Sequence, residues 1–192
     1  MTAINTVATL YLMDKRFKLG QFGAQLWTRE KARQIRDDLT KELEALSAGD
    51  VLTIDAKGVE VFDYSFANEL FGKTLLGLPH EFPGRFVIVE NLTNYTRENL
   101  SKALEGMGLV MIEKKEKELS LLGKVNPIDQ QTFFAIARAK KPVTASELKE
   151  ELNINVNAVN ERLSKLTGLG LARRQSSVSA AGREQYEYSV LA

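Results

Sequence analysis

The chain has 192 residues, a net charge of +1 at pH 7, 44% apolar and 27% charged residues. This length and balance suit one or two globular domains with a buried core, and they exclude a disordered polyelectrolyte. The sequence has no cysteine, which excludes disulfides and thiolate metal sites, and its one histidine, His80, cannot form a multi-histidine metal centre.

The amino-terminal region predicts a strand rather than a targeting segment. The stretch "TVATLYL", residues 6–12, has the composition of an opening strand, and no basic leader with a long apolar run precedes it. Nowhere in the sequence does an apolar run reach the roughly 20 residues of a membrane span. We therefore expect a cytoplasmic protein with no membrane partner.

Residues 27–46 predict an amphipathic helix that packs on a sheet. Its apolar residues recur at helical spacing and form one stripe: Ala32, Ile35, Leu39, Leu43 and Leu46. This helix starts at "WTRE", and a later helix starts at "YTRE". Thr28 and Thr96 are the residues expected to cap these two helices.

The next segments alternate between strand and helix. We expect strands at "VLTIDA" and "RFVIVEN" and helices at "SFANELFGKTLL" and "TRENLSKALEGM". This order predicts an α/β fold, a sheet with parallel strands and packed helices. The stretch "GLVMIEKKEKELSLLG" then predicts a hairpin or edge strand. The pattern restarts after Gly123, so the predicted domains are residues 1–123 and 124–192.

The second predicted domain contains three helices and two strands. The first helix ends at Ala139, and Thr144 and Glu147 form a capping box for the second. The third helix has an apolar face of Val159, Leu163 and Leu166, and "GLGLARR" with "REQYEYSVLA" predicts two paired strands.

This arrangement resembles a winged helix-turn-helix domain over nearly all of residues 127–192. The resemblance implies that the third helix enters the DNA major groove and that the two strands form a wing. Base or phosphate contacts are implied on the third helix for Asn155, Asn157, Asn160, Glu161, Ser164 and Lys165. Wing contacts are implied for Arg173, Arg174 and Arg183. Asparagine can pair with adenine and arginine can neutralise phosphate.

Charge and composition leave two partners open for this domain. Residues 127–192 carry 9 basic and 7 acidic side chains, a slight excess that favours a polyanion. Glu161, however, stands where basic or hydroxyl residues are common in such domains, and winged helices also bind proteins. We expect double-stranded DNA as the partner, with protein contact as the alternative. A homodimer is a further expectation, since one recognition helix covers one half-site.

The first domain resembles STAS-like domains of unknown function, which are similar to anti-sigma-factor antagonists. The resemblance rests on "GDVLTIDAKGVEVFDYSFANELFGKTLLG" and covers most of residues 17–112. It implies a protein-docking face with Asp63, Tyr64, Ser65 and Asn68. In the antagonists a serine at the place of Ser65 is phosphorylated, and a phosphate there would meet helix-terminal amides. We favour the simpler interpretation that Ser65 or Asp63 caps the helix.

An enzyme was the weaker interpretation of the same region. Asp50, Asp55 and Asp63 lie close in sequence to the carboxyl end of an expected strand, where α/β proteins commonly bind ligands and Mg²⁺. The sequence has no GxxxxGK[ST] loop and no acidic pair of the receiver type. We expect no enzyme activity, cofactor or metal. The resulting hypothesis is a transcriptional regulator, with a phosphorylation-switched interaction scaffold as the alternative.

Overall fold

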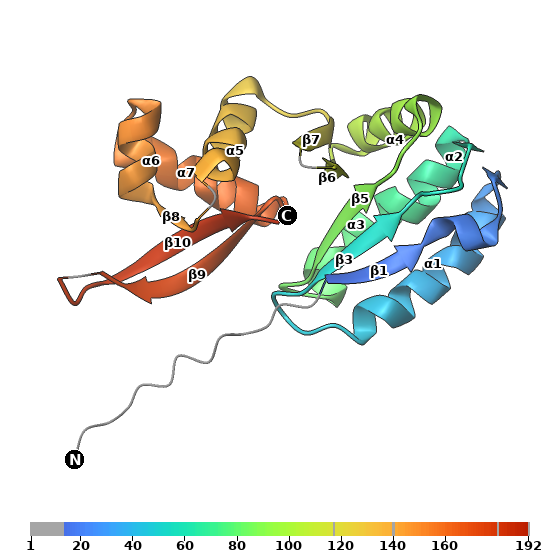
Figure 1. The fold of residues 1–192 in the computed structure, drawn as a ribbon, viewed down its shortest axis with the longest axis horizontal. Coiled ribbons are helices and arrows are strands. Elements are labelled where there is room, and N and C mark those ends of the chain that lie inside the picture. The colour runs from blue at the N-terminus through green and yellow to red at the C-terminus, as the bar shows by residue number, and fades with distance from the viewer. Residues whose placement is uncertain (1–13, 117, 140, 180, 192) are drawn as a thin grey trace, which may run out of the picture.

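A computed structural model describes residues 14–116, 118–139, 141–179 and 181–191. They form a mixed α/β structure in which a larger amino-terminal part is followed by a smaller carboxyl-terminal part (Figure 1). The mixed α/β class expected from the alternating pattern is confirmed. The strand expected at residues 6–12 lies outside the described residues.

A five-stranded sheet forms the centre of the amino-terminal part, in the order β1-β3-β5-β6-β7. Neighbouring strands are parallel from β1 to β6, and β7 pairs antiparallel with β6, which confirms the expected hairpin. The strands are β1 (Asp14–Lys18), β3 (Val51–Asp55), β5 (Phe86–Glu90), β6 (Val110–Lys115) and β7 (Glu118–Gly123). A short parallel pair, which the sequence pattern did not indicate, is formed by β2 (Gln25–Leu26) and β4 (Val61–Phe62).

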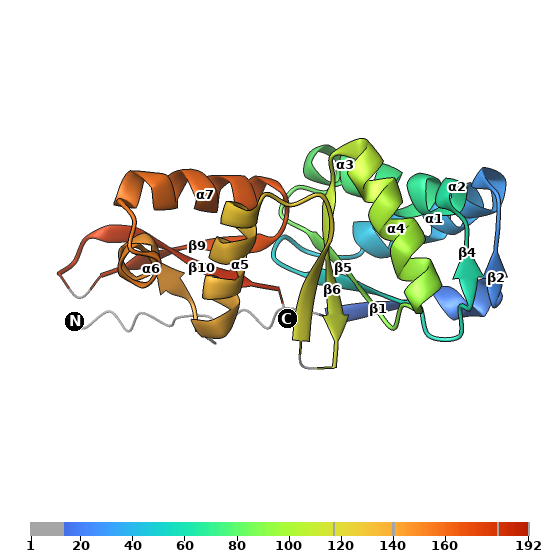
Figure 2. The same ribbon diagram turned by 90° about the horizontal axis from the view of Figure 1, so that it is seen from above.

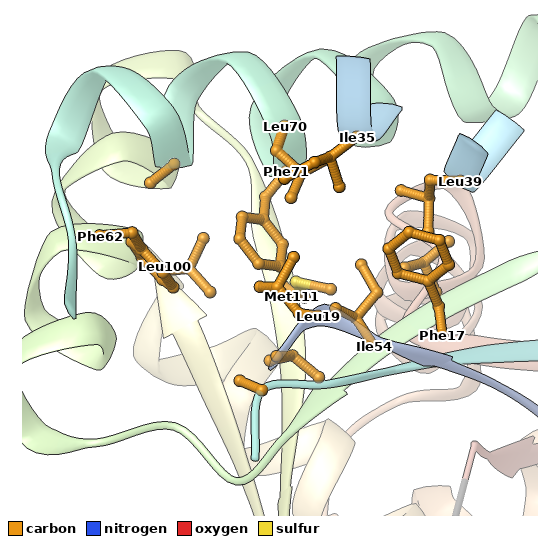
Figure 3. Close-up of a cluster of buried hydrophobic side chains, with 14 of the residues drawn as sticks. Phe17, Leu19, Ile35, Leu39, Ile54, Phe62, Leu70, Phe71, Leu100 and Met111 are labelled. Carbon is orange, nitrogen blue, oxygen red and sulfur yellow. The ribbon is translucent and has the colours of Figure 1, made fainter. Parts of the chain in front are cut away.

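The helices of this part pack their apolar residues on one face of the sheet. Three of them form the main contacts: α1 (Arg29–Glu44), the helix from Tyr64 to Glu81, and α4 (Asn94–Met107). The predicted stripe of α1 is fully buried against the strands. Figure 3 shows Ile35 and Leu39 of α1 and Leu100 of α4 around Ile54 and Met111 of the sheet. This cluster is the main hydrophobic core.

The two expected threonine caps have different outcomes. Thr28 caps α1, and its side chain accepts a hydrogen bond from the Lys31 amide, as expected. The expectation for Thr96 is wrong, because α4 begins earlier and Thr93 is its cap. The Thr93 hydroxyl accepts from the Thr96 amide at 3.1 Å, while the buried Thr96 hydroxyl donates back to the Thr93 carbonyl. Both threonines suit a helix start, and the path of the preceding loop decides between them.

The central helix is longer than expected, and a π-helical turn interrupts its α-helical geometry. It consists of α2 (Tyr64–Ala67), a π-helical turn η2 (Asn68–Gly72) and α3 (Lys73–Glu81). The π turn places the carboxylate of Glu69 in the interior, where it is 2% exposed. Glu69 there pairs with Arg33 at 3.2 Å and with Arg36 at 3.3 Å. The helix is therefore fixed to α1 by an ion pair as well as by apolar contacts.

The carboxyl-terminal part contains three helices and a three-stranded sheet, ordered β8-β10-β9. The helices are α5 (Pro127–Ala139), α6 (Ala145–Leu152) and α7 (Val156–Gly168). The strands are β8 (Val143–Thr144), β9 (Ala172–Val178) and β10 (Glu184–Val190). The expected capping box of Thr144 and Glu147 is present at the start of α6. The antiparallel pairing of β9 with β10 is also as expected, and β8 is an addition.

A second hydrophobic cluster joins the two parts. It contains Phe86 and Ile88 of β5 and Val110 and Ile112 of β6, from the sheet face opposite to the helices, together with the apolar residues of α5, α6 and α7. Figure 1 shows the carboxyl-terminal part on the side of the sheet away from α1 and α3. The expected domain boundary at 123/124 stays a prediction, because apolar packing is continuous across it.

The described helices give no sign of a membrane crossing. None of those between residues 14 and 191 is both long enough and apolar enough to span a bilayer.

Candidate nucleic-acid interface

Helix α7 has one face in the core and one face in solvent. Val159, Leu163 and Leu166 are completely buried, which confirms the apolar face expected from their spacing. Asn155 is the cap of the helix, and its side-chain oxygen accepts a hydrogen bond from the Ala158 amide at 2.8 Å. A capped start and a buried stripe fix the orientation of the helix, so its outer residues have a defined arrangement.

The outer face of α7 presents mostly uncharged polar groups. Asn157, Asn160, Glu161 and Ser164 are all exposed there, as the spacing predicted. The two asparagine amides can donate and accept hydrogen bonds together, which is the chemistry used to read adenine. Glu161 is the one acidic member, and it would repel phosphate.

Lys165 forms an ion pair within the carboxyl-terminal part. Its ammonium group contacts the carboxylate of Asp129, a buried residue in the first turn of α5. About half of the lysine side chain stays exposed, at 54%. The charge of Asp129 offsets that of Lys165, so the lysine contributes less positive potential to the outer face than its sequence position suggests.

The β9–β10 hairpin provides exposed arginines next to this helix. The guanidinium of Arg174 lies 4.6 Å from the centre of the exposed Tyr186 ring, a cation–π contact that restrains the arginine. Arg183 lies in the turn of the hairpin, where its amide donates to the Ser179 hydroxyl at 3.1 Å. Figure 2 shows the hairpin reaching past the amino end of α7.

Arg173 has a different position from its neighbour. It is only half exposed, its guanidinium donates to the carbonyl of Gly49, and it lies 5.5 Å from the Phe86 ring. Burial lowers the pKa of Arg173 and the nearby Asp50 opposes that shift, although a guanidinium stays charged. Arg173 thus connects the hairpin to the amino-terminal part, and phosphate contact would require it to leave these partners.

Tyr186 is a residue of this surface that the sequence reasoning missed. Its ring is 52% exposed and supports Arg174 across the hairpin. The alternation of "REQYEYSVLA" places Tyr186 and Tyr188 on one strand face, but the partner residues depend on the strand register. That register follows from the turn at residues 179–183, whose length the sequence does not specify.

The predicted docking residues lie at the start of the central helix. Asp63 is the cap of α2, and its carboxylate accepts from the Phe66 amide at 2.6 Å. Ser65 is inside the first turn and is half-buried, so of the two capping candidates Asp63 has the role. Tyr64 is 43% exposed, and Asn68 begins the π turn. These four residues therefore lie along α2 and the start of the π turn, at the amino end of the central helix.

The three aspartates considered for catalysis are not gathered in one place. Asp50 accepts from the Ser47 amide at the amino end of β3, so its expected position near a carboxyl end is wrong. Asp55 is at the other end of that strand and Asp63 caps α2. In the part of the chain that the structure describes, no group of three or more His, Asp or Glu side chains could hold a metal ion.

Asp55 participates in a network at the carboxyl end of β3. Its carboxylate accepts from the Asn91 amide group at 2.7 Å and from the Lys57 backbone amide at 2.9 Å. Desolvation alone would raise its pKa, but these hydrogen bonds and the charge of Arg16 together lower it below the ordinary value. Asp55 is therefore ionised at neutral pH, which suits a structural role in this loop.

Comparisons with known proteins give no family for the chain. No protein-family model matches it, and no curated protein matches it. Solved structures similar to it include a protein of Methanosarcina mazei Go1 described as a possible transcriptional regulator, with 16% identity and a TM-score of 0.33. That match covers 35% of this chain and 57% of the other. The ORC1 protein of Aeropyrum pernix in complex with DNA matches with 10% identity and a TM-score of 0.32, covering 93% of this chain and 75% of that one. Likenesses this low support no conclusion about this chain.

Proposed function

We propose that the protein is a DNA-binding regulator whose α5–β10 part acts as a winged helix-turn-helix domain. The observation that carries the proposal is the outer face of α7, where Asn157, Asn160 and Ser164 are exposed. The hairpin that carries the exposed Arg174 and Arg183 reaches past the amino end of this helix. The amides would read base edges in the major groove, and the arginines would contact phosphates. Contact with a palindromic site would need a homodimer.

The amino-terminal part would receive the signal in this proposal. Its one-sided helix layer on a mostly parallel sheet is in keeping with a STAS-like domain, a class used for protein docking. Because the second sheet face packs on α5–α7, a change in this part can reach α7 through direct contacts. We place its docking surface at the first turn of α2, where Tyr64 is exposed and Ser65 is half-buried.

Salt-dependent DNA binding tests the proposal. Selection from random duplexes, followed by fluorescence anisotropy of the selected duplex, should give a binding constant that falls as salt rises. Replacing Arg174 and Arg183 by Glu should weaken binding by about tenfold or more. It should also make the negative slope of log K against log salt shallower by about 2, because two phosphate contacts are lost.

The matched control reverses the same amount of charge elsewhere. Lys73→Glu with Lys115→Glu changes two exposed lysines of the amino-terminal part and should leave DNA affinity nearly unchanged. Equal losses in the two double variants would mean that only net charge matters. Absence of any selected duplex at low salt would remove DNA binding from the proposal.

The alternative function is a protein-interaction scaffold that phosphorylation of Ser65 switches. It is favoured by the exposure of Tyr64 and by the position of Ser65 in the first helical turn. A phosphate on Ser65 would lie near the positive helix end and also near the Asp63 carboxylate, which repels it. Mass spectrometry of the protein from its native host, with Ser65→Ala as the control, tests whether the phosphate occurs.

A further inference from the structure

A cavity of about 480 Å³ lies where the two parts of the chain meet. Its walls come from the end of α3 and the following loop, the amino ends of β5 and β6, and residues 167–171, which are the end of α7 and the turn before β9. This volume is within the range of about 300–1,000 Å³ that small-molecule sites usually have. A junction between two packed parts is also a preferred place for such sites.

The walls of the cavity are largely apolar. Leucine, valine, phenylalanine and proline side chains dominate, among them Phe86, Val110 and Leu169. Leu76 lies at the cavity with 55% of its surface exposed. An apolar ligand that covers Leu76 would remove this surface from water, which favours binding.

The ionisable groups of the cavity are both of the basic type. They are Arg85 and His80, and none of the wall residues in the described chain has a carboxylate. The Arg85 side chain is held in place, since its Nε donates to the Leu46 carbonyl at 2.8 Å and its guanidinium lies 5.7 Å from the Phe82 ring. The neighbouring carboxylate, Glu81, lies next to Gly77 and lines a separate cavity with Arg36 and Lys73.

We propose that this cavity is an effector site for a small organic acid with an apolar body. The apolar walls would enclose the hydrocarbon part, and Arg85 would pair with the carboxylate, a charge-assisted contact. A neutral or cationic ligand of the same shape would lose this pairing. The complementarity therefore selects an amphipathic carboxylate over the corresponding alcohol or amine.

The cavity also suggests how the ligand acts. Because residues 167–171 include the last two residues of α7 and the turn that follows, a ligand in the cavity contacts both the amino-terminal part and the carboxyl end of that helix. If the two parts can adopt two arrangements that differ in ligand affinity, the ligand raises the population of the arrangement that binds it more tightly. This step rests on the proposed function of α7, whereas the binding of the ligand does not.

Calorimetry on the full chain tests the site without DNA. Decanoate is the probe, and decanol and decylamine are its neutral and cationic controls. Decanoate should bind saturably with one site per chain, and about tenfold more tightly than either control. Equal binding of the three, or no saturable binding of decanoate, would overturn the proposal.

Two variants at one position serve as a matched pair. Leu76→Asp adds a negative charge at the cavity and should weaken decanoate binding by about tenfold, whereas Leu76→Lys should bind it at least as well as the unchanged protein. Leu76 is exposed, so both variants should fold, which thermal unfolding checks. Equal affinities for Leu76→Asp and Leu76→Lys would place the ligand elsewhere and overturn the site.

A second measurement separates the site from the DNA proposal. Saturating decanoate should change the affinity for the selected duplex by about fivefold or more in the unchanged protein, and much less in Leu76→Asp. If decanoate binds but the duplex affinity stays constant, the coupling is refuted and the site stands. If no duplex binds at all, the DNA proposal fails and the calorimetric result still decides the site.

Discussion

Arg173 and Arg174 are adjacent in the sequence and have different environments. Successive residues of a strand point to opposite sides, so Arg174 faces solvent over Tyr186 while Arg173 faces the amino-terminal part. Arg173 contacts Gly49 and Phe86, and both partners are more than 80 positions away from it in the sequence. At this scale, the direction in which a strand side chain points decides whether an arginine is exposed to solvent or packed between the two parts.

We predict that Arg173→Ala lowers the free energy of unfolding by about 1–3 kcal/mol. The change removes a buried hydrogen bond and the packing of the guanidinium on Phe86. Urea denaturation followed by the fluorescence of Trp27 measures the effect. The control, Arg174→Ala, removes an exposed side chain and should stay within about 0.5 kcal/mol. A larger loss in the control than in Arg173→Ala would contradict the assigned positions.

At the scale of elements, helix starts decide where functional side chains point. Besides α1, four helices begin at a cap whose side chain accepts a hydrogen bond from the backbone amide three residues later: Asp63, Thr93, Thr144 and Asn155. Thr144 has the fuller arrangement, because the Glu147 carboxylate also accepts from the Thr144 amide at 2.7 Å. Hydrogen bonds from Thr144 and Lys141 lower the pKa of Glu147, so it is ionised at neutral pH.

Thr144→Ala should destabilise the protein by about 1 kcal/mol, because the start of α6 loses its cap. Thr144→Ser retains a hydroxyl at the same place and should recover most of this loss. Thermal unfolding by circular dichroism compares the two variants with the unchanged protein. If the serine variant were as unstable as the alanine variant, the hydroxyl would not be the stabilising group.

For the whole molecule, the shared cluster on the second sheet face is the main feature. Ile88 of β5 is 2% exposed and packs in the cluster that includes Phe133 and Leu163 of the carboxyl-terminal part. A sheet with helices on one face leaves the other face apolar unless something covers it. Here α5–α7 provide that cover, so each part contributes to the stability of the other.

We therefore expect the two parts to unfold together. Ile88→Ala should lower the free energy of opening of amides in α1 and in α7 by the same amount, about 2–4 kcal/mol, because it leaves a cavity in the shared cluster. Hydrogen exchange followed by mass spectrometry measures both helices in one sample, and Leu76→Ala at an exposed site is the control. Loss of protection in α7 alone would show that the parts unfold independently.

Most of the secondary structure could be predicted because its causes are local. The stripe of α1, the capping box at Thr144 and the buried face of Val159, Leu163 and Leu166 follow from side-chain spacing and short-range hydrogen bonds. The exposed asparagines of α7 follow from the same spacing. Thr96 was predicted wrongly because Thr93, three residues earlier, is an equally good cap and the loop before it makes the choice.

The sequence by itself determined the main alternation of helices and strands and which helix faces are apolar, since both depend on neighbours a few residues away. Only the tertiary structure decided that Lys165 pairs with Asp129, that Arg173 faces Gly49, and that α7 and α3 enclose a cavity. These features need residues from distant segments to meet. Their free energies arise from burial and from polar contacts between segments far apart in the chain, and a local pattern of side chains does not specify such contacts.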